Sequence, residues 1–130
     1  MRFLFAFVFT FMLSFSAFTQ SAGSFEYQTL DTTIIKNGIE KLNIYYRESC
    51  GRCTNMMDAF DNAGIEYEKL DYDIEENKRT AEKLIYNTLP NKAMGYSTRF
   101  PLVEINETFY FCIANHHEFT LQLLEFYSFE

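Results

Sequence analysis

Residues 42–53 read Leu-Asn-Ile-Tyr-Tyr-Arg-Glu-Ser-Cys-Gly-Arg-Cys, an apolar run followed by two cysteines that two residues separate. The next residues, 54–63, have the apolar spacing of a helix. The pair Cys50 and Cys53 therefore falls where a strand ends and a helix begins. At a helix N-terminus, unpaired backbone N–H groups and the positive end of the helix dipole face the first cysteine. We expect Cys50 to be unusually acidic and nucleophilic, with Cys53 within disulfide reach.

The chain has three cysteines, an odd number, so disulfides can account for at most two of them. A bridge between Cys50 and Cys53 closes a very short loop and restricts the unfolded chain little. Such a bridge is more plausibly chemical than structural. For Cys112, which lies among apolar residues, we expect a small buried side chain, and the alternative is a regulatory or glutathionylated thiol.

The first residues of the chain resemble a targeting segment. Arg2 is followed by an uncharged, Phe-rich run over 3–18 and by small and polar residues over 19–23. This pattern predicts a secretory signal spanning 1–23, cleaved at about 19–23, and hence a periplasmic or secreted protein. The alternative is an uncleaved membrane anchor, for which the run is shorter than the ~20 apolar residues that a span needs. We interpret 24–40 as an N-terminal extension or linker and 41–130 as one domain.

The charge balance limits the partners of this chain. It carries 18 acidic and 11 basic side chains, a formal net charge of −7. Nucleic acid and anionic membrane surfaces attract basic proteins, so we expect neither as a partner. We expect a monomer.

The pattern of apolar residues predicts four strands and three helices. Strands are expected at 42–47, 67–73, 101–105 and 108–112, and helices at 51–63, at 74–89 and from Asn115 through Phe126. Gly64 is expected to cap the first helix, and Pro90 to end the second. Asn106 and Glu107 are expected to form the turn of a β-hairpin.

Each of the first two helices has an apolar face. The residues expected on these faces are Met56, Met57, Phe60 and Ala63 in the first helix and Ala81, Leu84 and Ile85 in the second. Asn115 and Glu118 have the spacing of a capping box. We expect His116 and His117 to lie exposed in the first turn of the last helix.

The order β-α-β-α-β-β-α, with the cysteine pair after the first strand and a proline opening the third, resembles the thioredoxin fold in its minimal glutaredoxin form. This is an α/β fold with a central mixed four-stranded sheet. Arg47 lies three residues before Cys50, where glutaredoxins usually carry a lysine, and Pro101 follows Cys50 at close to the glutaredoxin separation. The resemblance implies that the Phe100–Pro101 peptide bond is cis and that its flanking backbone clamps an extended peptide or glutathione.

The resemblance also implies roles for the site residues. Cys50 would be the attacking thiolate and Cys53 the resolving thiol. The substrate-binding residues would be Arg47, Arg52, Arg99, Phe100 and Pro101. Arg47 and Arg52 would also favour a thiolate at Cys50, which Glu48 opposes. For Arg52 and Arg99, a solvated surface side chain is the alternative.

These observations favour an exported glutaredoxin-like thiol–disulfide oxidoreductase. Its substrates would be protein disulfides or glutathione mixed disulfides, its redox partner is unknown, and no cofactor or metal is expected. After the hairpin, however, residues 110–114 read Tyr-Phe-Cys-Ile-Ala, where glutaredoxins usually have glycines and an acidic pair that hold glutathione.

Two other classes of function remain open. One is a metal-binding module, in which Cys50, Cys53, Cys112 and a histidine hold zinc or copper, or Cys50 holds an iron–sulfur cluster. The other is a domain that binds extended peptides without catalysis.

Overall fold

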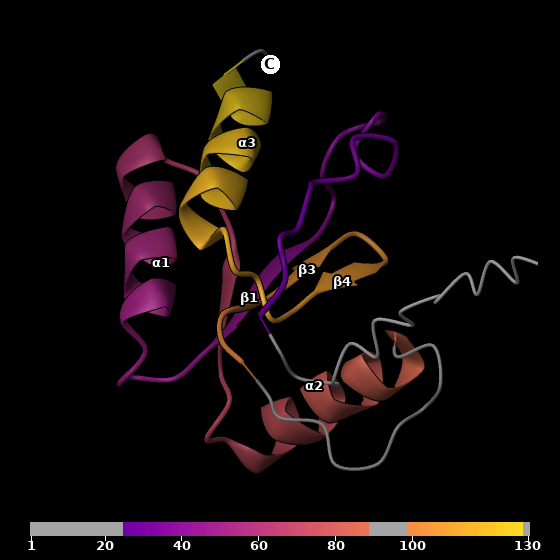
Figure 1. The fold of residues 1–130 in the computed structure, drawn as a ribbon, viewed down its shortest axis with the longest axis vertical. Coiled ribbons are helices and arrows are strands. Elements are labelled where there is room, and N and C mark those ends of the chain that lie inside the picture. The colour runs from indigo at the N-terminus through magenta and orange to yellow at the C-terminus, as the bar shows by residue number, and fades with distance from the viewer. Residues whose placement is uncertain (1–24, 89–98, 129–130) are drawn as a thin grey trace, which may run out of the picture.

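The computed structural model describes residues 25–88 and 99–128 of the chain (Figure 1). Within these two ranges, seven elements follow one another in the predicted order β-α-β-α-β-β-α. They are β1 (Leu42–Tyr46), α1 (Gly51–Ala63), β2 (Glu68–Asp71), α2 (Glu75–Thr88), β3 (Leu102–Ile105), β4 (Thr108–Tyr110) and α3 (His116–Ser128).

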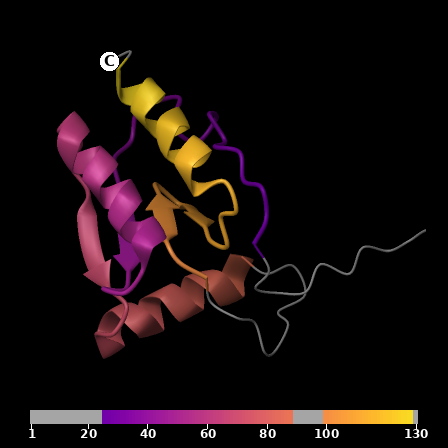
Figure 2. The same cartoon turned by 60° about the vertical axis from the view of Figure 1, so that its left-hand side comes forward.

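The four strands form one sheet in the order β2-β1-β3-β4. Strand β1 pairs parallel with β2, and the other two pairings are antiparallel, so the sheet is mixed, as predicted. Helices α1 and α3 lie together on one face of the sheet, and α2 covers the other (Figure 2). This arrangement confirms the expected thioredoxin-like α/β fold.

Side chains alternate across the two central strands, as the period of an extended chain requires. Ile44 and Val103 belong to the core beneath α1 and α3, whereas Tyr45 and Leu102 belong to the core beneath α2. All four are at most 1% exposed. Because both faces of β1 and β3 are covered, the C-terminal end of β1 and the N-terminal end of β3 are held in fixed positions.

Helix α1 has the predicted bounds. Cys50 is its N-cap, and Gly64 ends it in the left-handed conformation, φ 70°, which a residue without a side chain adopts freely. Met56 and Phe60 are fully buried. Ala63 is exposed, which corrects the expected inward face, because the last turn of the helix borders an open groove rather than the sheet.

Strand β4 ends two residues earlier than predicted. Cys112 has a φ of 55°, so the chain leaves the extended conformation before this residue. Strand β2 is also shorter than the expected 67–73, because the chain turns after Asp71, whose carbonyl accepts a bond from the Ile74 amide at 3.2 Å. Helix α2 begins at Glu75, and its expected end at 89 and Pro90 lie outside the described residues.

The N-terminal extension packs onto the domain. Leu30 and Ile35 are buried in the core beneath α1 and α3. Glu26 forms an isolated parallel β-bridge with Ile113, just beyond β4. The side chain of Asn115, expected in a capping box, instead binds the backbone of the extension at Gln28. The extension and the turn before α3 therefore form one packed unit.

No helix within residues 25–88 and 99–128 is long and apolar enough to cross a membrane. The predicted signal or anchor, 1–23, lies outside these residues.

Candidate redox site

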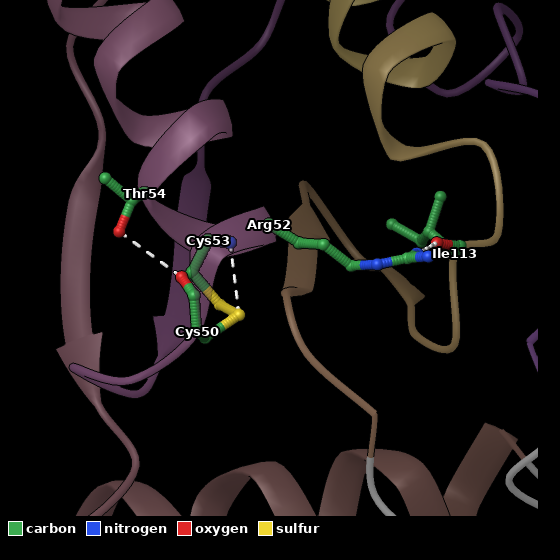
Figure 3. The surroundings of a disulfide bond; sticks show 5 residues. All are labelled: Cys50, Arg52, Cys53, Thr54 and Ile113. Carbon is green, nitrogen blue, oxygen red and sulfur yellow. Dashed lines mark hydrogen bonds between the residues drawn. A yellow bond between two sulfur atoms is a disulfide. The ribbon is translucent and has the colours of Figure 1, made fainter.

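The two cysteines of the pair form a disulfide at the N-terminus of α1 (Figure 3). Their Cα atoms lie 5.3 Å apart. The Cys50 sulfur accepts a hydrogen bond from the Cys53 amide, with a nitrogen–sulfur distance of 3.1 Å. Cys53 is fully buried, whereas Cys50 is partly exposed. Only the first cysteine can therefore be reached by a large substrate.

The local electrostatics favour a negative charge on Cys50 once the pair is reduced. The first turn of α1 contains no acidic residue that would oppose the helix dipole. An amide donor aimed at the sulfur stabilises a thiolate more than a neutral thiol. Thr54 donates its amide to the Cys50 carbonyl at 3.1 Å, which begins the helix directly at the cysteine.

Arg47 lies on one side of this site, against the segment before β3. Its guanidinium pairs with Asp73 at 3.0 Å and lies over the rings of Tyr72 and Phe100, 5.4 and 5.6 Å from their centroids. The structure thus brings together three of the predicted substrate-binding residues, Arg47, Phe100 and Pro101. The ion pair is half exposed on both sides, so a substrate carboxylate could compete for the guanidinium at little cost.

The Phe100–Pro101 peptide bond is cis, as the resemblance implied. Pro101 is buried, and the Phe100 ring meets Tyr72 edge-on with a centroid separation of 4.8 Å.

Arg52 takes part in a contact that the sequence did not indicate. Its guanidinium donates to the carbonyl of Ile113 at 2.9 Å and to that of Ala114 at 3.4 Å. The side chain points away from the disulfide toward the turn before α3 (Figure 3). It also lies over the Phe25 ring, 4.2 Å from the centroid. Arg52 is half-buried and bonded rather than solvated, and it ties the spacer of the cysteine pair to the turn.

Arg99 contacts the same aromatic ring. Its guanidinium lies 5.6 Å from the centroid of Phe25. Two predicted substrate-binding arginines, Arg52 and Arg99, therefore meet at Phe25, a residue that sequence reasoning missed. No local pattern marks Phe25, because its partners follow it by 27 and 74 positions in the chain.

Cys112, the third cysteine, is buried, with 3% of its surface exposed. Burial raises the pKa of its thiol above the ordinary value of 9.0, while the backbone N–H and the charge of Arg99 act in the opposite direction. Both effects of burial, steric and electrostatic, lower its reactivity, because the thiolate is the reactive form.

We therefore expect Cys112 to resist alkylation in the folded, oxidised protein. At pH 8 its reaction with iodoacetamide should be at least about a hundredfold slower than in the denatured protein, since reaction requires local opening. Mass spectrometry of timed samples measures this rate, and labelling as fast as in denaturant would contradict the burial of Cys112.

His116 begins α3 and is partly buried. Burial lowers its pKa below 6.5, and the charges of Arg52 and His117 act in the same direction. Among the described residues there is no group of three or more His, Cys, Asp or Glu side chains that could hold a metal ion.

No protein-family model matches this chain, and no curated protein gives a significant match. Among solved structures, it is similar to the glutaredoxin-like protein NrdH-redoxin from Escherichia coli, with 21% sequence identity and a TM-score of 0.41. The match covers 54% of this chain and 79% of that one. This similarity is too low to support a conclusion about fold or function. The fold is identified from the sheet topology, and the candidate site from the geometry of the two cysteines described above.

Proposed function

We propose that this chain is an exported, glutaredoxin-like thiol–disulfide oxidoreductase that acts on protein disulfides or glutathione mixed disulfides. Cys50 is the nucleophile and Cys53 the resolving thiol. Export is inferred from the apolar run 3–18 and the small residues after it.

The unequal surroundings of the two cysteines carry this proposal. Cys50 caps α1, is partly exposed and receives the Cys53 amide at 3.1 Å, whereas Cys53 is fully buried. A nucleophile needs access and a stabilised thiolate, while a resolving thiol needs only to reach the first sulfur. A disulfide that only stabilises the fold does not require one exposed and one buried cysteine.

In the reducing direction, the Cys50 thiolate attacks one sulfur of the client disulfide. A bond forms between the two sulfurs, the client S–S bond breaks, and the second client sulfur leaves as a thiolate that takes up a proton. Cys53 then loses its proton and attacks the Cys50 sulfur. This step re-forms the Cys50–Cys53 disulfide and releases the first client sulfur as a thiolate. Two electrons have passed to the client, and the reverse sequence oxidises a client dithiol.

The reduction potential of the pair tests the proposal. The full chain, purified in mild detergent, is equilibrated with glutathione or dithiothreitol buffers, and the Cys50–Cys53 disulfide is quantified by thiol trapping and mass spectrometry. A potential near about −120 mV would indicate an oxidant, and one between about −200 and −270 mV a reductant that needs a donor. The Cys112→Ser variant is measured in parallel so that the third thiol cannot contribute. If no buffer produces a reversible Cys50–Cys53 disulfide, the proposed function is wrong.

A further inference from the structure

The N-terminal arm, defined as residues 25–30, is fastened along the turn between β4 and α3. The Glu26 amide donates to the Cys112 carbonyl at 2.8 Å, and the Ala114 amide donates to the Glu26 carbonyl at 2.7 Å. Gln28 exchanges two bonds with the Asn115 side chain, at 2.7 and 2.8 Å. Bonds that involve the backbone at four places hold the arm in one position.

Arg52 contacts the same turn between β4 and α3 to which the arm is bonded. Arg52 lies between the two cysteines and donates to the carbonyls of Ile113 and Ala114. Together, Arg52 and the arm occupy the carbonyls of Cys112, Ile113 and Ala114 and the Ala114 amide. These three carbonyls and the Ala114 amide therefore already have hydrogen-bond partners within the chain.

A small, charged and flexible peptide such as glutathione has little apolar surface, so its affinity depends on a few well-placed polar contacts. At the Ala114 amide, which already donates to the arm, such a contact would require breaking the bond to Glu26. A folded client protein instead gains affinity from a larger interface, in which exposed aromatic rings and arginines are the most effective contacts. The structure has such a surface here, because Phe25 is 41% exposed and its ring contacts the guanidinium groups of Arg52 and Arg99.

We propose that the arm makes protein disulfides, rather than small glutathione mixed disulfides, the substrates of this site, and that Phe25 is the arm's contact with the client. The proposal rests on the proposed function, since it concerns the choice of substrate for Cys50. The Phe25 ring contacts the guanidinium groups of both Arg52 and Arg99, so these three side chains form one cationic and aromatic surface that starts from the residue between the two cysteines.

The test compares two disulfides in a reaction that needs no external donor. The full chain in mild detergent is reduced, freed of reductant, and mixed with insulin or with the mixed disulfide of glutathione and 2-mercaptoethanol. Oxidation of Cys50–Cys53 is followed by quenched alkylation and mass spectrometry. The rate constant with insulin should exceed that with the small disulfide by about tenfold or more. Phe25→Ala should lower the insulin rate constant roughly tenfold and change that of the small disulfide at most about twofold.

Two variants distinguish a direct contact between the Phe25 ring and the client from an indirect effect of the substitution on the structure. Phe25→Tyr keeps the ring and should retain the insulin rate constant, and Tyr86→Ala, which removes a comparably exposed ring from α2, should leave both rate constants unchanged. Equal rate constants for the two substrates in the unaltered chain, or an equal loss with both in Phe25→Ala, would overturn the proposal. If neither disulfide oxidises the pair in the unaltered chain, the proposed function itself fails.

Discussion

Replacing Cys50 by serine is expected to abolish disulfide exchange, with a loss of at least about a thousandfold in rate. The replacement of Cys53 by serine should have a different result. Cys50 can still attack, because it is the exposed cysteine at the start of α1, but nothing then releases the client. The Cys53→Ser variant should therefore accumulate a mixed disulfide between Cys50 and the client, visible as a mass increase on non-reducing analysis.

The control for both variants is Cys112→Ser, because Cys112 is the other cysteine of the chain and is buried away from solvent. It should exchange disulfides at the rate of the unaltered protein. The assignment of roles would be wrong if Cys50→Ser trapped the client while Cys53→Ser did not, since the resolving cysteine would then be Cys50.

A matched pair of leucines in α3 gives the largest expected effect on stability. Leu123 is fully buried against the sheet, whereas Leu121 is 51% exposed on the same helix. Leu123→Ala leaves a cavity and should lower the free energy of unfolding by about 2–5 kcal/mol. Leu121→Ala should change it by no more than about 0.5 kcal/mol.

Urea denaturation of the oxidised full chain, followed by far-UV circular dichroism, measures both values. The two variants share the same chemical change in the same helix, so a difference in helix propensity cannot account for a difference between them. Similar losses in the two variants would mean that α3 does not pack on the sheet through Leu123.

The elements that the sequence predicted well are those whose signals are local. Helix α1 has the predicted bounds because Cys50 and Gly64 mark its two ends. The β-hairpin of β3 and β4 could be anticipated because Asn106 and Glu107 are a turn signal that acts over a few residues. Strand β4 was predicted too long, since nothing in the residue type of Cys112 indicates a positive φ.

The contacts that the sequence could not indicate join residues far apart in the chain. Arg52 and Ile113 are 61 positions apart, and Gln28 and Asn115 are 87 apart. A capping box at Asn115 was a sound local expectation, but the arm offers the same side chain two backbone bonds. The cysteine pair could be found from its spacing, whereas the surface beside it depends on tertiary packing that no local pattern shows.

The position of the arm determines which end of the chain is the better point for attaching a tag or a linker. Phe25, the first residue of the arm as defined above, contacts Arg52 and Arg99. Helix α3 runs away from that edge to Ser128 and the C-terminal end (Figure 1). We therefore expect an affinity tag or a surface linker on the C-terminal side to leave Cys50 accessible, whereas one joined just before Phe25 would lie next to the side chains of Arg52 and Arg99.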